Sequence, residues 1–146
     1  MKITTPSQKD YSELVSVWES SVRATHDFLT EQDILFYKPM LADQFFPQVT
    51  LKCIKNTDNR ILGFIGTAEK NIEMLFIDPD YRGQGVGKKL LTYALNQLGT
   101  TKVDVNEQND QAVGFYQHLG FKVIGRSDKD GMGKPFPLLH MEIHCA

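Results

Sequence analysis

The sequence predicts one α/β (α+β) domain in which helices cover a mixed β-sheet. Three observations favour this class. Helix-like and strand-like segments are interleaved along the chain. The length of 146 residues leaves room for one core of ordinary size. Hydrophobic residues make up 41% of the chain and charged residues 23%, which is typical of a folded globular protein. We therefore expect a single domain spanning residues 1–146.

Two helices are predicted at the start of the chain. Ser7 and Asp10 have the spacing of a capping box, and apolar residues then recur at helical intervals to about Thr25. Thr30 is a second candidate N-cap. The segment that it begins contains Pro39, which should kink or split the helix because proline lacks a backbone N–H.

Three strands are predicted next. Residues 49–55 and 61–68 flank the polar turn 56–60, which is the pattern of a β-hairpin. Residues 72–78 carry apolar side chains on both faces, as expected for a strand in the middle of a covered sheet. Pro79 should end this strand.

Helices and strands alternate in the second half. Apolar residues form one face of a helix over residues 85–98, which Gly99 ends. A short strand is expected at 102–107, and Asn109 can cap a helix that closes at Gly120. The remaining predicted strands are 121–125 and 138–144, on either side of a loop rich in Asp, Gly and Pro.

Charge and hydropathy disfavour several classes of partner. Sixteen basic against eighteen acidic residues give a formal charge of −2, which is too balanced for broad neutralisation of nucleic-acid phosphates. No apolar run approaches the roughly 18 residues of a membrane span, and the N-terminus lacks the apolar region of a signal peptide. We therefore expect a cytoplasmic protein that binds neither nucleic acid nor membrane.

Cysteine and histidine usage predicts no disulfide framework and no metal site. Cys53 and Cys145 are too few and too widely spaced for either, so both are expected to be reduced thiols. His118, His140 and His144 also lack the spacing of metal ligands.

The most informative segment is the Gly-rich turn at residues 78–88, between a predicted buried strand and a helix start. Gly83, Gly85 and Gly87 leave backbone amides exposed, and amides at a helix N-terminus favour an anion, above all a phosphate. The alternative is a flexible turn with solvated basic residues, because a lone Gly-rich motif is weak.

Two common phosphate-binding motifs do not fit this turn. A Walker loop needs glycine and Ser or Thr where the chain has Arg82 and Lys89. The dinucleotide pattern Gly-x-Gly-x-x-Gly begins at Gly83 and Gly85 but has Lys88 in its third glycine position. What remains is Arg-x-x-Gly-x-Gly, with Arg82 and Lys88 adding positive charge beside the amides.

With these residues, the chain resembles the GNAT superfamily of acetyl-CoA-dependent N-acetyltransferases. The resemblance implies a mixed, mostly antiparallel central sheet with helices on both faces. It covers about residues 61–139, whereas the first sixty residues match only in general layout. The residues that carry it are Leu75-Phe76-Ile77-Asp78-Pro79, Tyr81-Arg82-Gly83-Gln84-Gly85-Val86-Gly87, Asn109 with Ala112, and Phe115-Tyr116 leading to Leu119-Gly120-Phe121.

The resemblance implies a binding site for acetyl-CoA as cosubstrate. The backbone of Leu75 and Ile77 would pair with the pantetheine arm like an added strand, while their side chains pack in the core. Asn109 would hydrogen-bond the same arm, and the central strand is expected to splay from its neighbour near residues 75–77. The amides implied to hold the pyrophosphate belong to Arg82, Gly83, Gln84, Gly85, Val86, Gly87 and Lys88.

Acyl transfer from a thioester to an amine needs a neutral amine, a stabilised carbonyl oxygen and a proton for the leaving thiolate. The resemblance implies Tyr116 as the general acid, against the alternative of a structural tyrosine anchored by its hydroxyl. It also implies that the N–H of Leu75 stabilises the oxyanion. Glu73 is a candidate base because it should share the face of Leu75 and Ile77. A solvated or ion-paired carboxylate is the alternative for Glu73.

The acceptor is expected to meet the link between the first two helices, where His26, Asp27 and Phe28 combine an ionisable ring, a carboxylate and an aromatic ring. His26 is a second candidate base, although a capping or structural histidine is commoner. The loop 129–137 would form a mobile wall over the acceptor. The acceptor is a small-molecule amine or a peptide or protein amine, and the protein is a monomer or a homodimer.

Two other classes of function remain as alternatives. A non-catalytic acyl-CoA-binding sensor or regulatory module would keep the Gly-rich turn without needing an acid, so Tyr116 favours the enzyme. An RNA-binding α/β domain would need a basic, aromatic sheet face. The balanced charge and apolar strands disfavour that alternative.

Overall fold

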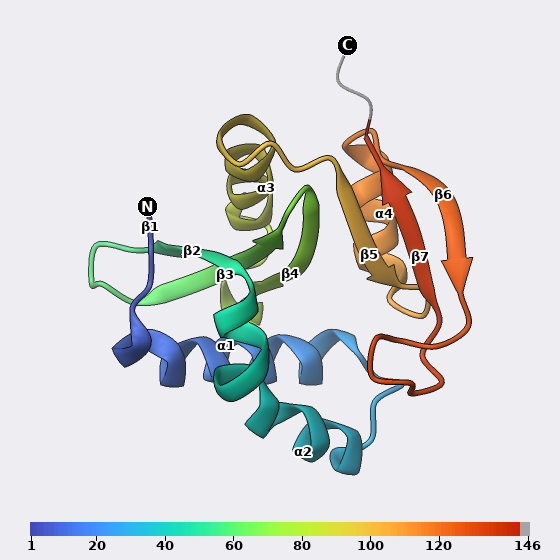
Figure 1. Cartoon of the computed structure of the whole chain (residues 1–146). Helices are drawn as coiled ribbons and strands as arrows, with labels where there is room; N and C mark the ends of the chain where they lie inside the picture. Colours follow the sequence, from blue (N-terminus) through green and yellow to red (C-terminus); the bar gives the residue numbers. More distant parts are fainter. Residues whose placement is uncertain (144–146) are drawn as a thin grey trace.

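The computed structural model describes residues 1–143 and contains a seven-stranded sheet (Figure 1). The strands are β1 (Lys2–Thr4), β2 (Thr50–Lys55), β3 (Ile61–Ala68), β4 (Asn71–Ile77), β5 (Lys102–Asn106), β6 (Lys122–Ser127) and β7 (Leu138–Glu142). Their order in the sheet is β1-β2-β3-β4-β5-β7-β6. Only β4 and β5 pair in parallel, so the predicted mixed, mostly antiparallel sheet is confirmed.

Helices cover both faces of this sheet. The helices α1 (Tyr11–Thr25) and α2 (Glu31–Met40) pack on one face, and α3 (Val86–Gln97) and α4 (Asp110–His118) on the other. The sheet therefore separates two apolar cores. Leu14 and Trp18 of α1 belong to the first core, together with Phe64 of β3. Leu90 of α3 and Tyr116 of α4 belong to the second.

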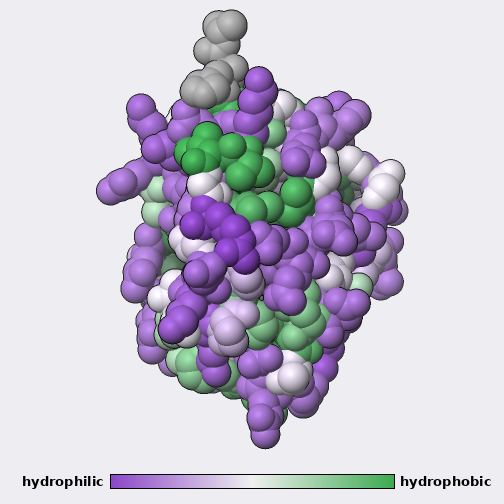
Figure 2. Space-filling view, turned by 90° about the vertical axis from the view of Figure 1, so that its right-hand side faces the viewer, coloured by the Kyte–Doolittle hydropathy of each residue, from purple (hydrophilic) through white to green (hydrophobic). Residues whose placement is uncertain are grey.

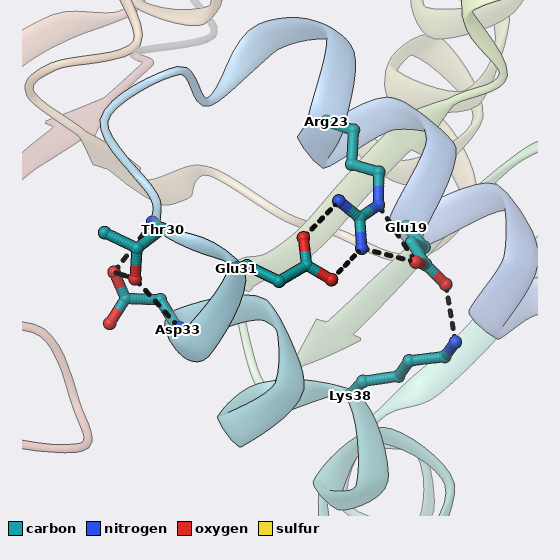
Figure 3. Close-up of polar contacts among 6 residues, drawn as sticks. All are labelled: Glu19, Arg23, Thr30, Glu31, Asp33 and Lys38. Carbon is teal, nitrogen blue, oxygen red and sulfur yellow. Dashed lines mark hydrogen bonds and ion pairs between the residues drawn. The ribbon is translucent and has the colours of Figure 1, made fainter.

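Local capping signals fix where three helical segments begin. The N–H of Ser7 donates to the Asp10 carboxylate at 2.9 Å, but this box opens a short 3₁₀ turn, Gln8–Asp10, that leads into α1. The Thr30 hydroxyl oxygen accepts from the N–H of Asp33 at 3.1 Å (Figure 3). Asn109 caps α4 by accepting from the N–H of Ala112 at 3.2 Å. Each cap satisfies an N–H that has no partner inside its helix.

Pro39 lies just before a change of helix type. α2 ends one residue after it, and the chain continues as a π-helical turn, Leu41–Phe45, and a 3₁₀ turn, Phe46–Gln48. The expected split is therefore observed as a switch in hydrogen-bond pattern. Leu41 and Phe46 are buried in the core beneath α1.

The strands β4 and β5 diverge soon after they meet. Their register contains only the pairs Asn71↔Lys102 and Ile72↔Val103. This confirms the expected splay of the central strand, because the rest of β4 has no ladder partner on its β5 side. Backbone groups along this edge are free to bind something else.

A bulge in β4 lies at Glu73. The register with β3 shifts between Gly66 and Thr67, so Gly66 lies opposite Met74 and Thr67 opposite Ile72. Glu73 is the extra residue, so simple alternation along β4 does not fix the face of its side chain. That Glu73 shares the face of Leu75 and Ile77 stays a prediction.

Other differences lie at the ends of the chain. The short strand β1 was not predicted, and it pairs with β2 through Ile3↔Ile54. The strand expected at 121–125 occupies Lys122–Ser127, and β7 ends at Glu142. His144 and Cys145 lie outside the described residues. Cys53 is a buried free thiol.

The sheet ends at β6, which exposes apolar side chains. Val123 is 46% exposed and Ile124 58%. Figure 2 shows the side of the molecule that carries this edge, where hydrophobic atoms gather among hydrophilic ones. The register with β7 shifts between Val123 and Gly125, which makes Ile124 a bulge residue. Edge bulges of this kind disturb the straight edge that a second strand would need for pairing.

Within residues 1–143, no helix is both long and apolar enough to cross a membrane. The same residues contain no group of three or more His, Cys, Asp or Glu side chains placed to hold a metal ion.

Candidate active site

A cavity of about 380 Å³, here called the turn cavity, lies between the Gly-rich turn, β4 and α4. Every predicted coenzyme-binding residue lines it except Gln84. Sequence reasoning did not select Gln111, whose side-chain oxygen accepts from Arg82 at 3.4 Å. The lining residues that were predicted are Leu75, Ile77, Arg82, Gly83, Gly85, Val86, Gly87, Lys88 and Asn109.

The backbone of the turn explains why glycine occurs there. Gly83 and Gly85 have φ of 77° and 81°, in the left-handed region that side chains disfavour. Gly85 is the N-cap of α3, and the N–H of Lys89 makes the first helical bond, to the Gly85 carbonyl, at 3.0 Å. The N–H groups of residues 86–88 precede that bond and lack helical partners. They line the turn cavity at the positive end of the helix dipole, which suits a phosphate.

Tyr116 presents its hydroxyl from a packed helix. Its side chain is buried, and its ring makes edge contacts with Phe115 and Phe121 at 5.3 and 5.4 Å between centroids. Among the described residues, no side chain or backbone group hydrogen-bonds this hydroxyl. Burial raises the pKa of Tyr116, so the phenol holds its proton at neutral pH.

On the opposite side of β4 lies a second cavity of about 630 Å³, here called the large cavity. α1, α2, the π-helical turn, β4 and the β6–β7 loop all contribute to its wall. Glu73 and His26 line it, whereas Asp27 and Phe28 do not. Phe28 packs on the His26 ring at 5.2 Å, so it supports a lining residue from behind.

A third cavity of about 170 Å³, here called the junction cavity, occupies the place where β4 and β5 separate. Tyr116 of α4 and Glu73 of β4 both line it. His26 and Phe76 line all three cavities. The junction cavity at the splay therefore shares lining residues with both the turn cavity and the large cavity.

His26 is a neutral imidazole in this setting. Its pKa is lowered to about 4, chiefly by burial and also by the nearby Arg82 guanidinium, while Asp27 opposes the shift. Nδ1 lies 2.7 Å from the Thr25 hydroxyl and Nε2 lies 3.4 Å from the amide nitrogen of Asn109. His26 thus joins the α1–α2 link to the cap of α4.

A charged network fixes α2 against α1 (Figure 3). The Arg23 guanidinium donates to both carboxylate oxygens of Glu31 at 2.6 and 2.8 Å and to Glu19 at 2.9 Å. Lys38 reaches the other oxygen of Glu19 at 2.6 Å. The network bridges the two helices on either side of the link that carries His26.

The β6–β7 loop closes one side of the large cavity. The Tyr37 hydroxyl donates to the Asp130 carboxylate at 2.5 Å. Lys134 lies over the Phe36 ring at 4.3 Å, and Phe136 packs on Phe28 at 5.8 Å. The loop was expected to cover the acceptor, but its partners on α2 were missed because no local pattern links residues 93 positions apart.

The chain matches a known family. Residues 30–145 match the family described as an acetyltransferase (GNAT) domain. The peptidyl-lysine N-acetyltransferase YjaB of Escherichia coli (strain K12) is 46% identical over 132 residues, which cover 88% of this chain and 87% of that protein. The peptidyl-lysine N-acetyltransferase YiaC of the same strain is 23% identical over 112 residues, 76% of each chain.

Solved structures have the same fold. The solution structure of apo-form YjaB from Escherichia coli superposes with a TM-score of 0.90 at 41% identity, covering 99% of this chain and 98% of that one. The PaiA N-acetyltransferase of Thermoplasma acidophilum, solved in complex with coenzyme A, has a TM-score of 0.77 at 22% identity, covering 98% of each chain.

Proposed function

The chain belongs to the GNAT family of acetyltransferases, and from this premise we propose that it moves an acetyl group from acetyl-CoA to the side-chain amine of a lysine in a peptide or protein. The acceptor class rests on the relative that is 46% identical over most of both chains and is named a peptidyl-lysine N-acetyltransferase. Family membership also favours an enzyme over a non-catalytic acyl-CoA sensor.

The turn cavity is the proposed coenzyme site. The free amides of residues 86–88 bind the pyrophosphate, and Arg82 and Lys88 add positive charge. The pantetheine arm follows the unpaired edge of β4 past Leu75 and Ile77, and Asn109 hydrogen-bonds it. This path brings the thioester to the junction cavity.

The proposed reaction is a direct attack. The neutral amine nitrogen bonds to the thioester carbonyl carbon, the carbon–sulfur bond breaks, and the amine loses one proton while the coenzyme A thiolate gains one. Tyr116 gives its proton to the leaving sulfur as the general acid. The N–H of Leu75 stabilises the carbonyl oxygen as it gains charge. Glu73 takes the proton of the amine, directly or through water.

One observation carries this function: the junction cavity is lined by both Glu73 and Tyr116 and adjoins the other two cavities through His26 and Phe76. A base and an acid that line one small cavity match the two proton transfers that acyl transfer requires.

The test uses purified protein, acetyl-CoA and a peptide with a blocked N-terminus and one lysine. We expect coenzyme A release that depends on the peptide, and mass spectrometry should locate the acetyl group on the lysine nitrogen. The control peptide has glutamine in place of lysine. Coenzyme A binding without turnover on any lysine peptide or amine would instead favour the sensor.

A further inference from the structure

We propose that the large cavity also accepts a second class of acceptor besides lysine. These are free primary amines in which a short chain links the nitrogen to an aromatic or branched apolar group, here called the apolar body. The first reason is size. The cavity measures about 630 Å³, within the range of roughly 300–1,000 Å³ that buries most of a drug-sized ligand. A lysine brings only an unbranched four-carbon stem and one nitrogen into it.

The second reason is the chemistry of the wall. Most of the lining is apolar, and aromatic side chains reach it from five separate parts of the chain: Trp18 from α1, Tyr37 from α2, Phe45 from the π-helical turn, Phe76 from β4 and Phe136 from the β6–β7 loop. An aromatic ring that lies between these side chains buries apolar surface on several of its sides. The linear side chain of a lysine leaves much of this apolar wall exposed to water.

The third reason is charge. None of the described residues that line the large cavity is a lysine or arginine, whereas Glu73 and Asp130 bring carboxylates to it. A single cationic amine suits this wall, and a substrate carboxylate does not. The Asp130 carboxylate already accepts from Tyr37, so a polyamine with several cations lacks enough partners there.

The fourth reason is the β6–β7 loop. Two adjacent residues of α2, Phe36 and Tyr37, hold this loop through Lys134 and Asp130, and the loop contributes Gly131 and Met132 to the wall. A compact molecule can therefore contact the loop as well as the other walls. A lysine enters only with its tip, because its backbone stays outside.

These features define how the amine binds. Its nitrogen lies at the junction cavity beside Glu73 and His26, and its apolar body lies between Trp18 and Phe45. The chemistry is unchanged and rests on the acetyl transfer proposed above: the carbon–nitrogen bond forms, the carbon–sulfur bond breaks, and coenzyme A leaves with a proton.

The experiment compares propylamine with phenylpropylamine, which have the same three-carbon chain without and with a ring. Initial rates are measured at saturating acetyl-CoA, with spermidine and the blocked lysine peptide alongside. We expect kcat/KM for phenylpropylamine to exceed that for propylamine by at least about tenfold, since one apolar group in a fitted pocket discriminates on this scale. Values for the two amines within about twofold, or a preference for spermidine, would overturn the proposal.

Two variants link the preference to the cavity. Ala68 lines it, so Ala68→Phe should remove most of the advantage of phenylpropylamine over propylamine. Gln44→Trp, at the exposed rim, is the second variant if Ala68→Phe fails to fold. Ala24→Phe on the exposed side of α1 is the matched control and should change neither amine. An unchanged preference in both folded cavity variants contradicts the assignment.

The lysine peptide separates the two proposals. Acetylation of the peptide without any ring preference among the amines rejects only the second class of acceptor. Acetylation of phenylpropylamine without the peptide supports the second class and rejects lysine as acceptor. Turnover of neither rejects both.

Discussion

At the residue scale, the chemistry depends on how single side chains are held. Tyr116 is locked between Phe115 and Phe121, so its hydroxyl position is set by packing. Its raised pKa keeps the proton on the phenol at neutral pH, so the hydroxyl is available as a donor to the developing thiolate. That combination suits a donor that acts only when the carbon–sulfur bond breaks.

Tyr116→Phe removes this proton and keeps the ring contacts. We expect the variant to fold, to bind acetyl-CoA and to lose about 10²- to 10⁴-fold in turnover, the usual scale of general acid catalysis. Single-turnover rates and acetyl-CoA titration would measure the two effects separately. An unchanged rate under conditions where chemistry is limiting would make Tyr116 a structural residue.

Glu73 and His26 are distinguished by their pH dependence. The pKa of His26 is lowered to about 4, so the ring is neutral throughout pH 5–8 and becomes protonated only as the pH falls through that value. A decline in rate between pH 8 and 5 therefore does not arise from His26. We expect Glu73→Gln to lower the rate most at neutral pH and less at high pH, where more amine is already neutral.

The matched variant is His26→Gln, measured over the same pH range. If His26 has only a structural role in the cavity wall, its loss should lower the stability of the fold. The pH–rate profile per folded molecule should then keep its shape. If the decline in rate at acidic pH is unaltered in both variants, a water chain or the ionisation of the amine itself would be the cause of that decline.

At the element scale, the Gly-rich turn was predictable because its signal is local. Glycines, a helix start and flanking basic residues lie within a few positions of one another, and the structure builds them into one wall of the turn cavity. Gln84 is the exception, since it does not line this cavity. The bulge at Glu73 was not predictable, because it depends on pairing with β3.

Gly87→Val tests the turn without straining its backbone. Unlike Gly85, Gly87 has no positive φ, and an added Cβ would lie 3.5 Å from the Phe115 ring and 3.7 Å from Ile77. The fold should therefore tolerate the change, while the new methyl groups fill the turn cavity. We expect coenzyme A binding to be nearly lost in calorimetric titration.

Arg82→Ala is the comparison for Gly87→Val. It removes a mobile charge and leaves the amide cradle intact, so we expect only moderate weakening of coenzyme A binding. If Gly87→Val bound coenzyme A normally while its melting temperature was unchanged, the turn cavity would not be the coenzyme site.

At the scale of the whole molecule, element types were easier to predict than their distant partners. The hairpin, α3 and α4 follow local periodicity and caps, whereas β1 has three residues and exists through its pairing with β2. The large cavity was only partly predicted for the same reason. His26 and the β6–β7 loop were selected, but the contact between Tyr37 and Asp130 joins segments with no shared local pattern.

The divergence of β4 from β5 divides the sheet into two halves that pair at few positions. β4 and β5 share two residue pairs, and β1–β4 and β5–β7 are otherwise separate ladders. A pantetheine arm bound along the open edge of β4 would add hydrogen bonds where the ladder stops. We therefore expect coenzyme A to stabilise the whole fold, by about 2.7 kcal/mol at a hundred times its Kd, because it binds the folded state alone.

Hydrogen exchange resolves where that stabilisation acts. The amides of Leu75 and Ile77, on the open edge of β4, should exchange slowly only when coenzyme A is bound, because a new acceptor then protects them. The polar turn 56–60 is the internal control, since exchange there does not require the sheet to open. Gly87→Val should abolish the protection at Leu75 and Ile77 and leave the turn unchanged. A rise in melting temperature without slower exchange at Leu75 and Ile77 would mean that coenzyme A binds elsewhere.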